Sequence, residues 1–336
     1  MASRLTKFGN DLYTGARSFN FVGRRKIWYL IAFVILAIAI IVPIFRGGLV
    51  FGIEFRGGSE FTVSGATPLD ETLAAPVIHD VVGEVPVHVT VVGGESIRVQ
   101  TEQLSAEQTK EVAAGLAEVY SVAADEVTSS FIGPTWGADV TRQAIIALIV
   151  FVVLAALFMA IYFRTWKMSL AAIVSLLHDL VITIGVYGVF GFEITPSAVI
   201  GFLTILGYSL YDTVVVFDKV RENTKEDANT LIRTFPESVN LAVNQTLVRS
   251  INTGVVAVLP VASILWIGAF VLGAGTLKDI ALALFIGIIV GTYSTIYIAA
   301  PFYSQLRERE PEIRKHTERV LEARAKSAES APAAAE

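Results

Sequence analysis

Residues 143–163 read QAIIALIVFVVLAALFMAIYF, a run of 21 residues without a charged side chain. A helix needs about 20 mostly apolar residues to cross the hydrocarbon of a bilayer. Five more largely apolar runs flank this one: Ile27–Phe45, Met168–Phe192, Thr195–Phe217, Ser250–Leu277 and Ile280–Leu306. The sequence therefore predicts a polytopic α-helical membrane protein with six transmembrane helices, one before a long polar segment and five after it.

The composition excludes several classes of function. The chain has 336 residues, of which 54% are apolar and 17% charged, whereas a soluble domain carries about 25% charged residues. It contains no Cys, which excludes a disulfide scaffold, a Cys-ligated metal and thiol catalysis. The net charge of −5 does not favour binding to nucleic acid, so no nucleic-acid partner is expected.

The distribution of Lys and Arg predicts the orientation in the membrane. If the N-terminus is cytoplasmic, six spans place 20 of the 26 basic residues on the cytoplasmic side, as the positive-inside rule requires. The predicted parts are a cytoplasmic N-terminus (1–26), helix 1 (27–46), an external domain (47–138), a five-helix membrane domain (139–306) and a largely disordered cytoplasmic tail (307–336). The tail is predicted to begin as a charged helix and to end in an Ala-, Ser-, Pro- and Glu-rich sequence.

The external domain has the pattern of a small α+β fold. Short runs of β-branched and aromatic residues alternate with two amphipathic helical patterns, and the second helical pattern opens with a capping box formed by Ser105 and Gln108. The predicted strands are Ser59–Ser64, Pro86–Val92, Ser96–Thr101 and Glu126–Phe131, and the predicted helices are Asp70–Val82 and Ser105–Tyr120. The order strand–helix–strand–strand–helix–strand predicts a ferredoxin-like domain. His79 and His88 lack any metal-ligand spacing, so no metal site is expected.

Asp212 is the most informative charge inside the predicted spans. A carboxylate in hydrocarbon costs at least a few kcal/mol and needs a partner, water or a proton. Asp212 lies five residues before the end of the fourth span, and Arg249 opens the fifth on the same predicted side. The two could pair and separate with the protonation of Asp212, which would make them a proton-driven switch. Alternatively, Asp212 reaches the headgroups and Arg249 is an ordinary basic flank.

Further polar and small residues in the spans could form a relay or a contact between helices. His178 and Asp179 lie about ten residues into the third span, and Thr204 and Tyr208 share a helical face with Asp212. Pro260 predicts a hinge in the fifth span, and Gly287 with Gly291 predicts a closely packed face on the sixth. No nucleotide-binding loop is present, so we expect no cofactor and a proton gradient as the energy source.

Three segments resemble the signature sequences of one family. Phe51–Gly58 reads FGIEFRGG, Gly207–Asn223 reads GYSLYDTVVVFDKVREN, and Gln245–Thr253 reads QTLVRSINT. Together with the arrangement of one span, an external domain and five spans, they are similar to the SecF branch of the SecD/SecF family of protein-export membrane proteins, within the RND superfamily of transporters. The chain departs from the family pattern at Tyr211, where Asn is usual, and at Glu54, where Asp is more common.

The resemblance implies a function and a set of partners. It implies an accessory, non-enzymatic subunit of the Sec pathway in the cytoplasmic membrane of a prokaryote, with both termini cytoplasmic. The implied partners are SecD, the SecYEG translocon, a translocating preprotein, YajC and the lipid bilayer. Asp212 and Arg249 match the residues of the family's proton pathway, and the proton motive force would assist translocation.

Other functions are weighed beside this one. Half of an RND-type exporter of a small molecule or lipid is the nearest alternative, although such pumps usually carry two large external domains in one chain. An intramembrane hydrolase or acyltransferase built around His178 and Asp179 would need His178 within hydrogen-bond reach of a nucleophile. Ser175 is the nearby candidate on the same helix. A structural scaffold would predict that Asp212→Asn is harmless.

Overall fold

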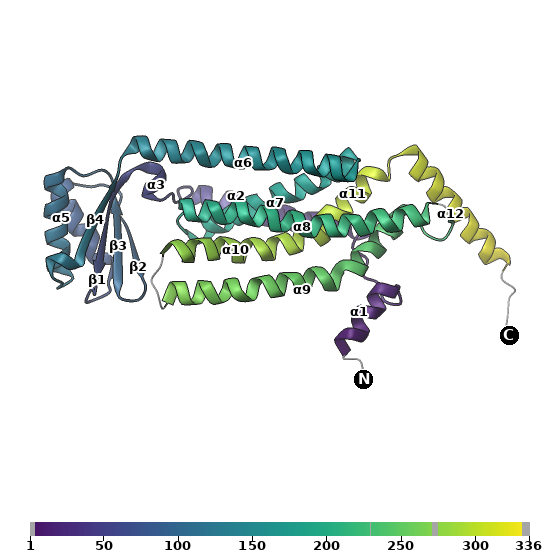
Figure 1. Ribbon diagram of the computed structural model, residues 1–336, viewed down its shortest axis with the longest axis horizontal. Coiled ribbons are helices and arrows are strands. Elements are labelled where there is room, and N and C mark those ends of the chain that lie inside the picture. The colour runs from purple at the N-terminus through teal and green to yellow at the C-terminus, as the bar shows by residue number, and fades with distance from the viewer. Residues whose placement is uncertain (1–3, 229, 271–274, 331–336) are drawn as a thin grey trace.

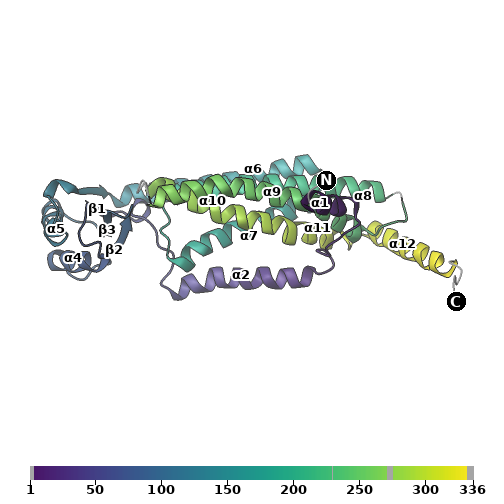
Figure 2. The same ribbon diagram turned by 90° about the horizontal axis from the view of Figure 1, so that it is seen from below.

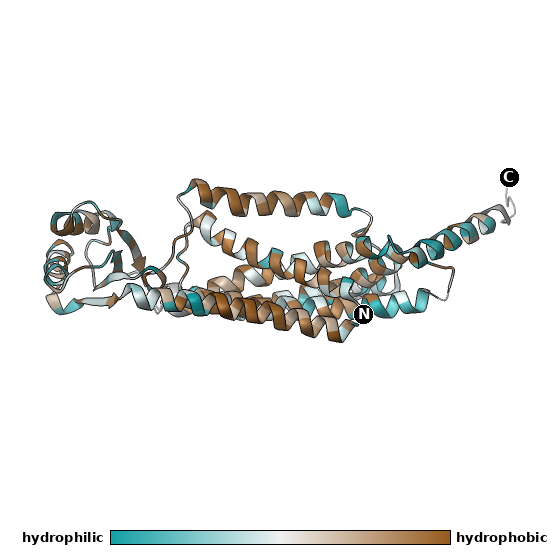
Figure 3. Cartoon of the chain, turned by 90° about the horizontal axis from the view of Figure 1, so that it is seen from above, coloured by the Kyte–Doolittle hydropathy of each residue, from teal (hydrophilic) through white to brown (hydrophobic). Residues whose placement is uncertain are grey.

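The computed structural model describes residues 4–228, 230–270 and 275–330. A small α/β domain lies at one end of a long helical bundle, and helices α1 (Arg4–Thr14) and α12 (Pro311–Ser330) lie toward the opposite end (Figure 1). The long bundle helices are predominantly apolar, whereas α12 is largely hydrophilic (Figure 3). This division matches the alternation of apolar and polar segments along the sequence.

The α/β domain is ferredoxin-like, as predicted. Its strands are β1 (Gly58–Ser64), β2 (His88–Val92), β3 (Ser96–Thr101) and β4 (Val127–Ile132), and they form an antiparallel sheet in the order β2-β3-β1-β4. In the register, Phe61 lies opposite Val99 of β3 and opposite Ser129 of β4. A short 3-10 helix, η1 (Glu71–Leu73), precedes α4 (Ala74–Val82), and a second one, η2 (Ala124–Glu126), precedes β4.

The core of this domain follows the alternation of its strands. Phe61, Val63, Ile97 and Val99 point to one face, where they are fully buried together with apolar residues of α4 and of α5 (Ala106–Val119). Helix α5 begins with the predicted capping box: the Ser105 side chain accepts from the Gln108 amide, and the Gln108 side chain accepts from the Ser105 amide. The other face of the sheet carries polar side chains, among them the paired Glu60 and Gln100.

Six helices of the described chain are long and apolar enough to span a membrane, in agreement with the sequence. They are α2 (Arg25–Phe45), α6 (Pro134–Phe163), α7 (Trp166–Phe190), α8 (Pro196–Asp227), α9 (Phe235–Phe270) and the continuous segment formed by α10 (Gly275–Ser294), the π-helical turn η3 (Thr295–Ala299) and α11 (Ala300–Arg307). The protein is therefore a multi-pass membrane protein.

Several helix boundaries differ from the sequence prediction. Helix α6 begins at Pro134 rather than Gln143, α8 continues to Asp227, and α9 begins at Phe235 rather than Ser250. These extra turns are polar, so a hydropathy pattern does not register them as part of the helix. Residues 275–277, predicted as the end of the fifth span, instead open α10, and hydropathy does not separate the two spans there because these residues are nearly as apolar as the spans themselves.

Small residues bring α2 against α7. A Cβ on Gly188 would lie 2.5 Å from Pro43 Cγ, and a Cβ on Gly185 would overlap Ala39. Helix α2 otherwise contacts few helices and lies at the side of the bundle (Figure 2). Glycine is required at these two positions because any side chain would separate the helices.

The chain leading into α2 is held by two asparagines of α9. The Asn244 side chain accepts from the Phe19 amide at 2.7 Å, and the Asn240 side chain accepts from the Phe21 amide at 2.8 Å. Helix α1 packs on α9 through Leu12, which is buried. The N-terminal segment is thus docked on the bundle, which its sequence did not predict.

The C-terminal segment corrects the prediction of a largely disordered tail. Residues Pro311–Ser330 form α12, and the remaining residues, 331–336, lie outside the described part of the chain. Helix α12 is fixed by the Arg324 guanidinium, which contacts Glu237 of α9 at 2.6 Å, and by His316, whose Nε2 lies 2.9 Å from the Thr230 carbonyl oxygen. Val320 is fully buried. Docking stabilises a segment whose composition alone does not favour order.

Candidate functional site: a polar centre inside the bundle

Two carboxylates lie buried among the membrane-spanning helices. Asp179 of α7 is 1% exposed and Asp212 of α8 is 5% exposed. Their helices pack in the middle of the bundle, and the hydroxyl groups that bond to these acids come from neighbouring helices. We call Asp179, Ser209, Asp212 and Ser250 the polar centre.

Asp212 is bonded to α9. The Ser250 hydroxyl donates to Asp212 Oδ1 at 2.9 Å, and this serine is itself buried. The other oxygen, Oδ2, is buried without a hydrogen-bond partner among the described residues. Asp212 therefore does not reach the headgroup region as a freely solvated acid, and one of its oxygens is open to a proton or a donor.

Asp179 joins α7 to α8. The Ser209 hydroxyl donates to Asp179 Oδ2 at 2.5 Å, and His178 Nδ1 lies 3.2 Å from Oδ1. The Thr183 hydroxyl donates to the Asp179 backbone carbonyl at 2.7 Å. Although neighbouring residues on a helix point in different directions, the His178 and Asp179 side chains meet here, and Ser209 is the third group.

Ser209 connects the two carboxylates along α8. Ser209 and Asp212 are three residues apart, so their side chains lie on adjacent positions of one helical face. The next residue, Thr213, bonds to Thr295 with a distance of 3.0 Å between the hydroxyl oxygens. Thr295 opens the π-helical turn η3, and such turns are frequent at functional sites. The polar centre therefore joins α7, α8 and α9, and its neighbour Thr213 reaches the last span.

Arg249 is not paired with Asp212 in this structure. Its guanidinium donates to the Tyr211 hydroxyl at 3.3 Å, and among the described residues no carboxylate oxygen lies within 4.0 Å of it. Arg249 is exposed on the surface of the chain. The sequence predicted Arg249 and Asp212 at the same level of the bundle, but it did not identify Tyr211 as the hydrogen-bond partner of Arg249.

Thr204 and Tyr208 differ in their surroundings. Thr204 is exposed, and its hydroxyl donates to the Ile200 carbonyl of its own helix at 2.7 Å. Tyr208 is half-buried. The structure places both on the face of α8 that continues to Tyr211, rather than within the polar centre.

The glycines of the last span permit close packing against α8. A Cβ on Gly291 would lie 3.0 Å from Ser209 Cβ, and a Cβ on Gly287 would overlap Ile205. Gly291 thus lies directly against a member of the polar centre. Helix α9 runs through Pro260 without a break in its helical assignment, and the proline is exposed. A hinge at Pro260 stays a prediction.

The geometry needed for a hydrolase is not formed at His178. Ser175 Oγ and His178 Nε2 are both buried without hydrogen-bond partners among the described residues. The His178 ring lies 6.2 Å from the Tyr293 ring, centroid to centroid. A nucleophile needs its base within hydrogen-bond reach, and this pair does not provide it.

A second group of acids lies where the α/β domain meets the bundle. The chain entering the domain pairs with the α7–α8 connection: the Gly52 amide donates to the Ile194 carbonyl at 3.0 Å, and the Ile194 amide donates to the Val50 carbonyl at 2.7 Å. Glu54, in the short helix α3 (Ile53–Arg56), and Glu193, in the α7–α8 connection, both extend toward Gly52. We call Glu54 and Glu193 the junction pair.

Burial perturbs both members of the junction pair. Glu54 Oε2 and Glu193 Oε1 are buried without hydrogen-bond partners in the described chain. Burial raises the pKa of Glu54, and the nearby Glu193 carboxylate raises it further. Burial also raises the pKa of Glu193, against the opposing effects of Gln100 and Arg98. Sequence reasoning missed this pair, because its members lie 139 positions apart in the chain.

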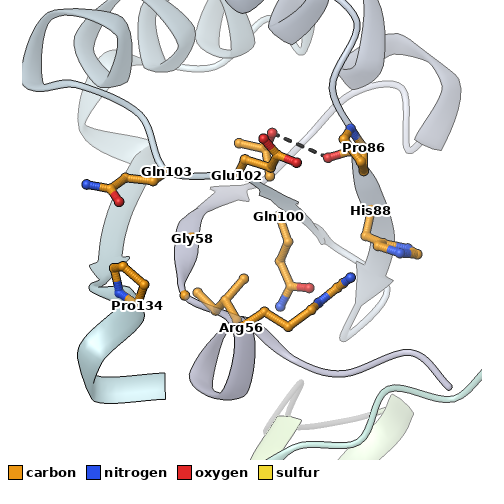
Figure 4. A pocket seen from close by; sticks show the side chains of 11 residues that line it. Arg56, Gly58, Pro86, His88, Gln100, Glu102, Gln103 and Pro134 are labelled. Carbon is orange, nitrogen blue, oxygen red and sulfur yellow. Dashed lines mark hydrogen bonds between the residues drawn. The ribbon is translucent and has the colours of Figure 1, made fainter. Parts of the chain in front are cut away.

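The polar face of the sheet borders a cavity of about 270 Å³. Arg56, His88 and Gln100 line it, with Glu102 and Pro134 on other sides (Figure 4). Burial and the Arg56 charge lower the pKa of His88, which favours a neutral imidazole. Within the described ranges, no group of three or more His, Asp or Glu residues is placed to hold a metal ion.

Several known proteins are similar to this chain. A family model described as "Protein export membrane protein SecD/SecF, C-terminal" matches residues 111–309. The protein translocase subunit SecF of Mycobacterium tuberculosis H37Rv is 44% identical, over 94% of this chain and 73% of its own length. That of Streptomyces coelicolor is 43% identical, over 99% of this chain and 90% of its own.

A solved structure has the same arrangement. The crystal structure of SecDF from Thermus thermophilus, described as a translocon-associated membrane protein, matches with a TM-score of 0.75 and 32% identity. The match covers 87% of this chain but 39% of the SecDF chain. This chain therefore spans well under half the length of that protein.

Proposed function

Because this chain belongs to the SecD/SecF family of protein-export membrane proteins, we propose that it is an accessory subunit of the Sec pathway that assists the translocation of secreted proteins. In this proposal it lies in the cytoplasmic membrane of a prokaryote. The excess of Lys and Arg on the side of the termini supports a cytoplasmic location for α1 and α12 and an external location for the α/β domain.

The observation that carries the proposal is the buried Asp212 with one open oxygen. An intramembrane acid is costly, and it marks an ion or proton pathway more often than a structural contact. Asp212 is bonded to α9 through Ser250, and Ser209, one turn away on α8, bonds to Asp179 of α7. Protonation of Asp212 would remove a charge from the contact between α8 and α9, and the energy of a proton gradient would enter the protein there.

The fold provides a route from the polar centre to the α/β domain. Helix α8 begins directly after the α7–α8 connection, whose Ile194 pairs with the chain entering the domain. Helix α6 begins at Pro134, two residues after β4 ends. A displacement of the membrane helices would therefore move the domain, which is attached to the bundle at both of its ends.

A SecD subunit is the proposed direct partner. The surface formed by Thr204, Tyr208 and Tyr211 of α8 and by Arg249 and Asn252 of α9 is polar and largely exposed within the spans. Polar side chains in a membrane rarely face lipid, so a second membrane half would cover this surface. A fused SecDF subunit from Thermus thermophilus is 33% identical to this chain and aligns over 38% of its own length. The rest of that protein is long enough to contain a second membrane half.

The wider partners follow from the same proposal. The SecYEG translocon and a translocating preprotein would be the working partners, and YajC an accessory one. No resident cofactor is required in this scheme, because the proton gradient supplies the energy.

The test is pulse-labelled export of a secreted reporter in cells that carry Asp212→Asn, with and without an uncoupler. We expect export to slow to the uncoupled rate, and the uncoupler to add nothing further. Asp218→Asn is the matched control, because Asp218 lies on the same helix but its carboxylate accepts from the exposed Tyr162 hydroxyl. Export at the wild-type rate in the Asp212 variant, at equal membrane abundance, would show that Asp212 is only a packing residue.

A further inference from the structure

Tyr211 and Asp212 contact neighbouring residues of α9 in the same register. Tyr211 bonds to Arg249 at 3.3 Å, and Asp212 bonds to Ser250 at 2.9 Å. The first contact lies on the exposed side of the helix pair and the second on the buried side, since Tyr211 and Arg249 are exposed while Asp212 and Ser250 are buried. The Arg249 guanidinium and the Asp212 carboxylate therefore lie on opposite sides of the α8–α9 pair.

The open oxygen of Asp212 makes this separation unexpected on electrostatic grounds. Asp212 Oδ2 has no donor among the described residues, and Arg249 sits one residue from the serine that bonds to Oδ1. An arginine next to a buried carboxylate with a free oxygen would normally form a charge-assisted hydrogen bond. In this structure a neutral phenol binds the guanidinium instead.

We propose that Tyr211 is a positioning residue whose hydroxyl holds Arg249 on the exposed side of α8, away from Asp212. The Arg249 guanidinium then has two alternative hydrogen-bond acceptors, the Tyr211 hydroxyl and Asp212 Oδ2. Tyr211 stabilises the position of Arg249 away from Asp212, so Asp212 remains free to take up a proton. This inference rests on the proposed function only for its consequence, because the position of Arg249 can be measured without any export assay.

The other charged and titratable groups near Asp212 are few. Tyr208 lies one turn before it on α8, and Arg249 is on α9. On α7, His178 and Asp179 approach through Ser209, and on the last span Tyr293 faces His178. Among these groups, Arg249 is the cation whose side chain can exchange its hydrogen-bond partner on α8, from Tyr211 to Asp212.

The first measurement is the rate at which phenylglyoxal modifies Arg249 in membranes that contain the full chain without a SecD subunit, which would otherwise cover this surface, followed by mass spectrometry. In Tyr211→Phe the ring remains but the hydroxyl is lost, so Arg249 should move to Asp212 and become buried. We expect modification to slow by about two- to tenfold, the range that one hydrogen bond provides. In the double variant Tyr211→Phe/Asp212→Asn the attraction is also lost, and the rate should return to at least the wild-type value.

A matched control separates the loss of the Tyr211–Arg249 hydrogen bond from a general effect of removing a tyrosine hydroxyl. Tyr162→Phe removes an exposed hydroxyl that also bonds to α8, at Asp218, and it should leave the modification rate of Arg249 unchanged. Equal membrane abundance of all variants shows that each one folds. An unchanged rate in Tyr211→Phe overturns the inference, as does a slow rate that persists in the double variant.

The second measurement is the pH profile of gradient-driven export. With Arg249 beside it, the Asp212 carboxylate is favoured in its ionised form, so Tyr211→Phe should need an external pH about one unit lower for half-maximal export. A slower modification rate together with this shift supports both the inference and the proposed function. A slower modification rate without any shift supports the position of Arg249 and contradicts its role in proton uptake.

Discussion

The polar centre and the junction pair both contain two buried acids, but they are stabilised in different ways. In the polar centre each carboxylate accepts a hydrogen bond from a serine on another helix. In the junction pair the two carboxyl groups converge on Gly52, and the Glu193 carboxylate raises the pKa of Glu54. The first arrangement links helices through the acids, whereas the second depends on backbone pairing and on nearby Arg98 and Gln100.

The difference indicates which acids support the fold and which oppose it. A buried carboxylate that accepts hydrogen bonds contributes to stability, and its removal leaves donors unpaired. A buried carboxyl group for which the cost of burial outweighs its donors, as at Glu54 and Glu193, is destabilising when ionised and is favoured in its protonated form. Removal of an acid should therefore destabilise the polar centre and stabilise the junction.

The largest effect is expected for Asp179→Ala. The Ser209 hydroxyl and His178 Nδ1 would both lose their partner in a buried site, which costs about 1–3 kcal/mol for each unsatisfied group. Thermal unfolding of the purified complex in nanodiscs measures the loss. Asp218→Ala should change little, because the half-buried Asp218 carboxylate accepts from the exposed Tyr162 hydroxyl. Equal losses in the two variants would show that Asp179 has no special structural role.

A smaller effect is expected for Ser250→Ala. It removes one hydrogen bond to Asp212 and leaves the carboxylate with no partner, at a cost of about 1–2 kcal/mol. The same unfolding assay applies, with Ser263→Ala as the control, because the Ser263 hydroxyl donates only to the backbone of its own helix. If Ser250→Ala proves no more destabilising than this control, the bond to Asp212 contributes nothing to the fold.

The smallest effect, of opposite sign, is expected for Glu193→Gln. The pKa of Glu193 is raised in the folded protein, so wild-type stability is greatest below the ordinary Glu pKa of about 4.3 and falls as the pH rises toward the folded-state pKa. The variant does not titrate there and should be more stable at neutral pH by about 1 kcal/mol or less, after solvent screening.

Unfolding at acidic and at neutral pH checks the sign of this effect. The gain should disappear at pH values near 4.3, where the wild-type group is already protonated. Glu84→Gln is the control, because the Glu84 side chain is 93% exposed. A variant that is less stable than wild type at neutral pH would show that ionised Glu193 stabilises the junction instead of destabilising it.

Much of the fold could be predicted from local sequence. The spans, the ferredoxin-like order and the capping box at Ser105 each depend on residues close together in the chain. The errors lie at the ends of helices, where polar turns continue beyond the bilayer, as in α8 and α9. The sequence does not predict the full length of α12, because the order of this helix depends on distant contacts. Arg324 contacts Glu237, 87 residues away, and His316 contacts Thr230, 86 residues away.

The sequence by itself determined that the chain spans a membrane six times, that Asp179 and Asp212 lie within the spans, and that Arg249 belongs at the same level as Asp212. Only the tertiary structure decided which groups these residues contact. Serine and threonine are too common in the spans for spacing to single out Ser209 and Ser250, and whether Arg249 binds Asp212 or Tyr211 depends on the rotation of α9 against α8. Hydropathy depends on the composition of one segment, whereas hydrogen bonds depend on the relative placement of two.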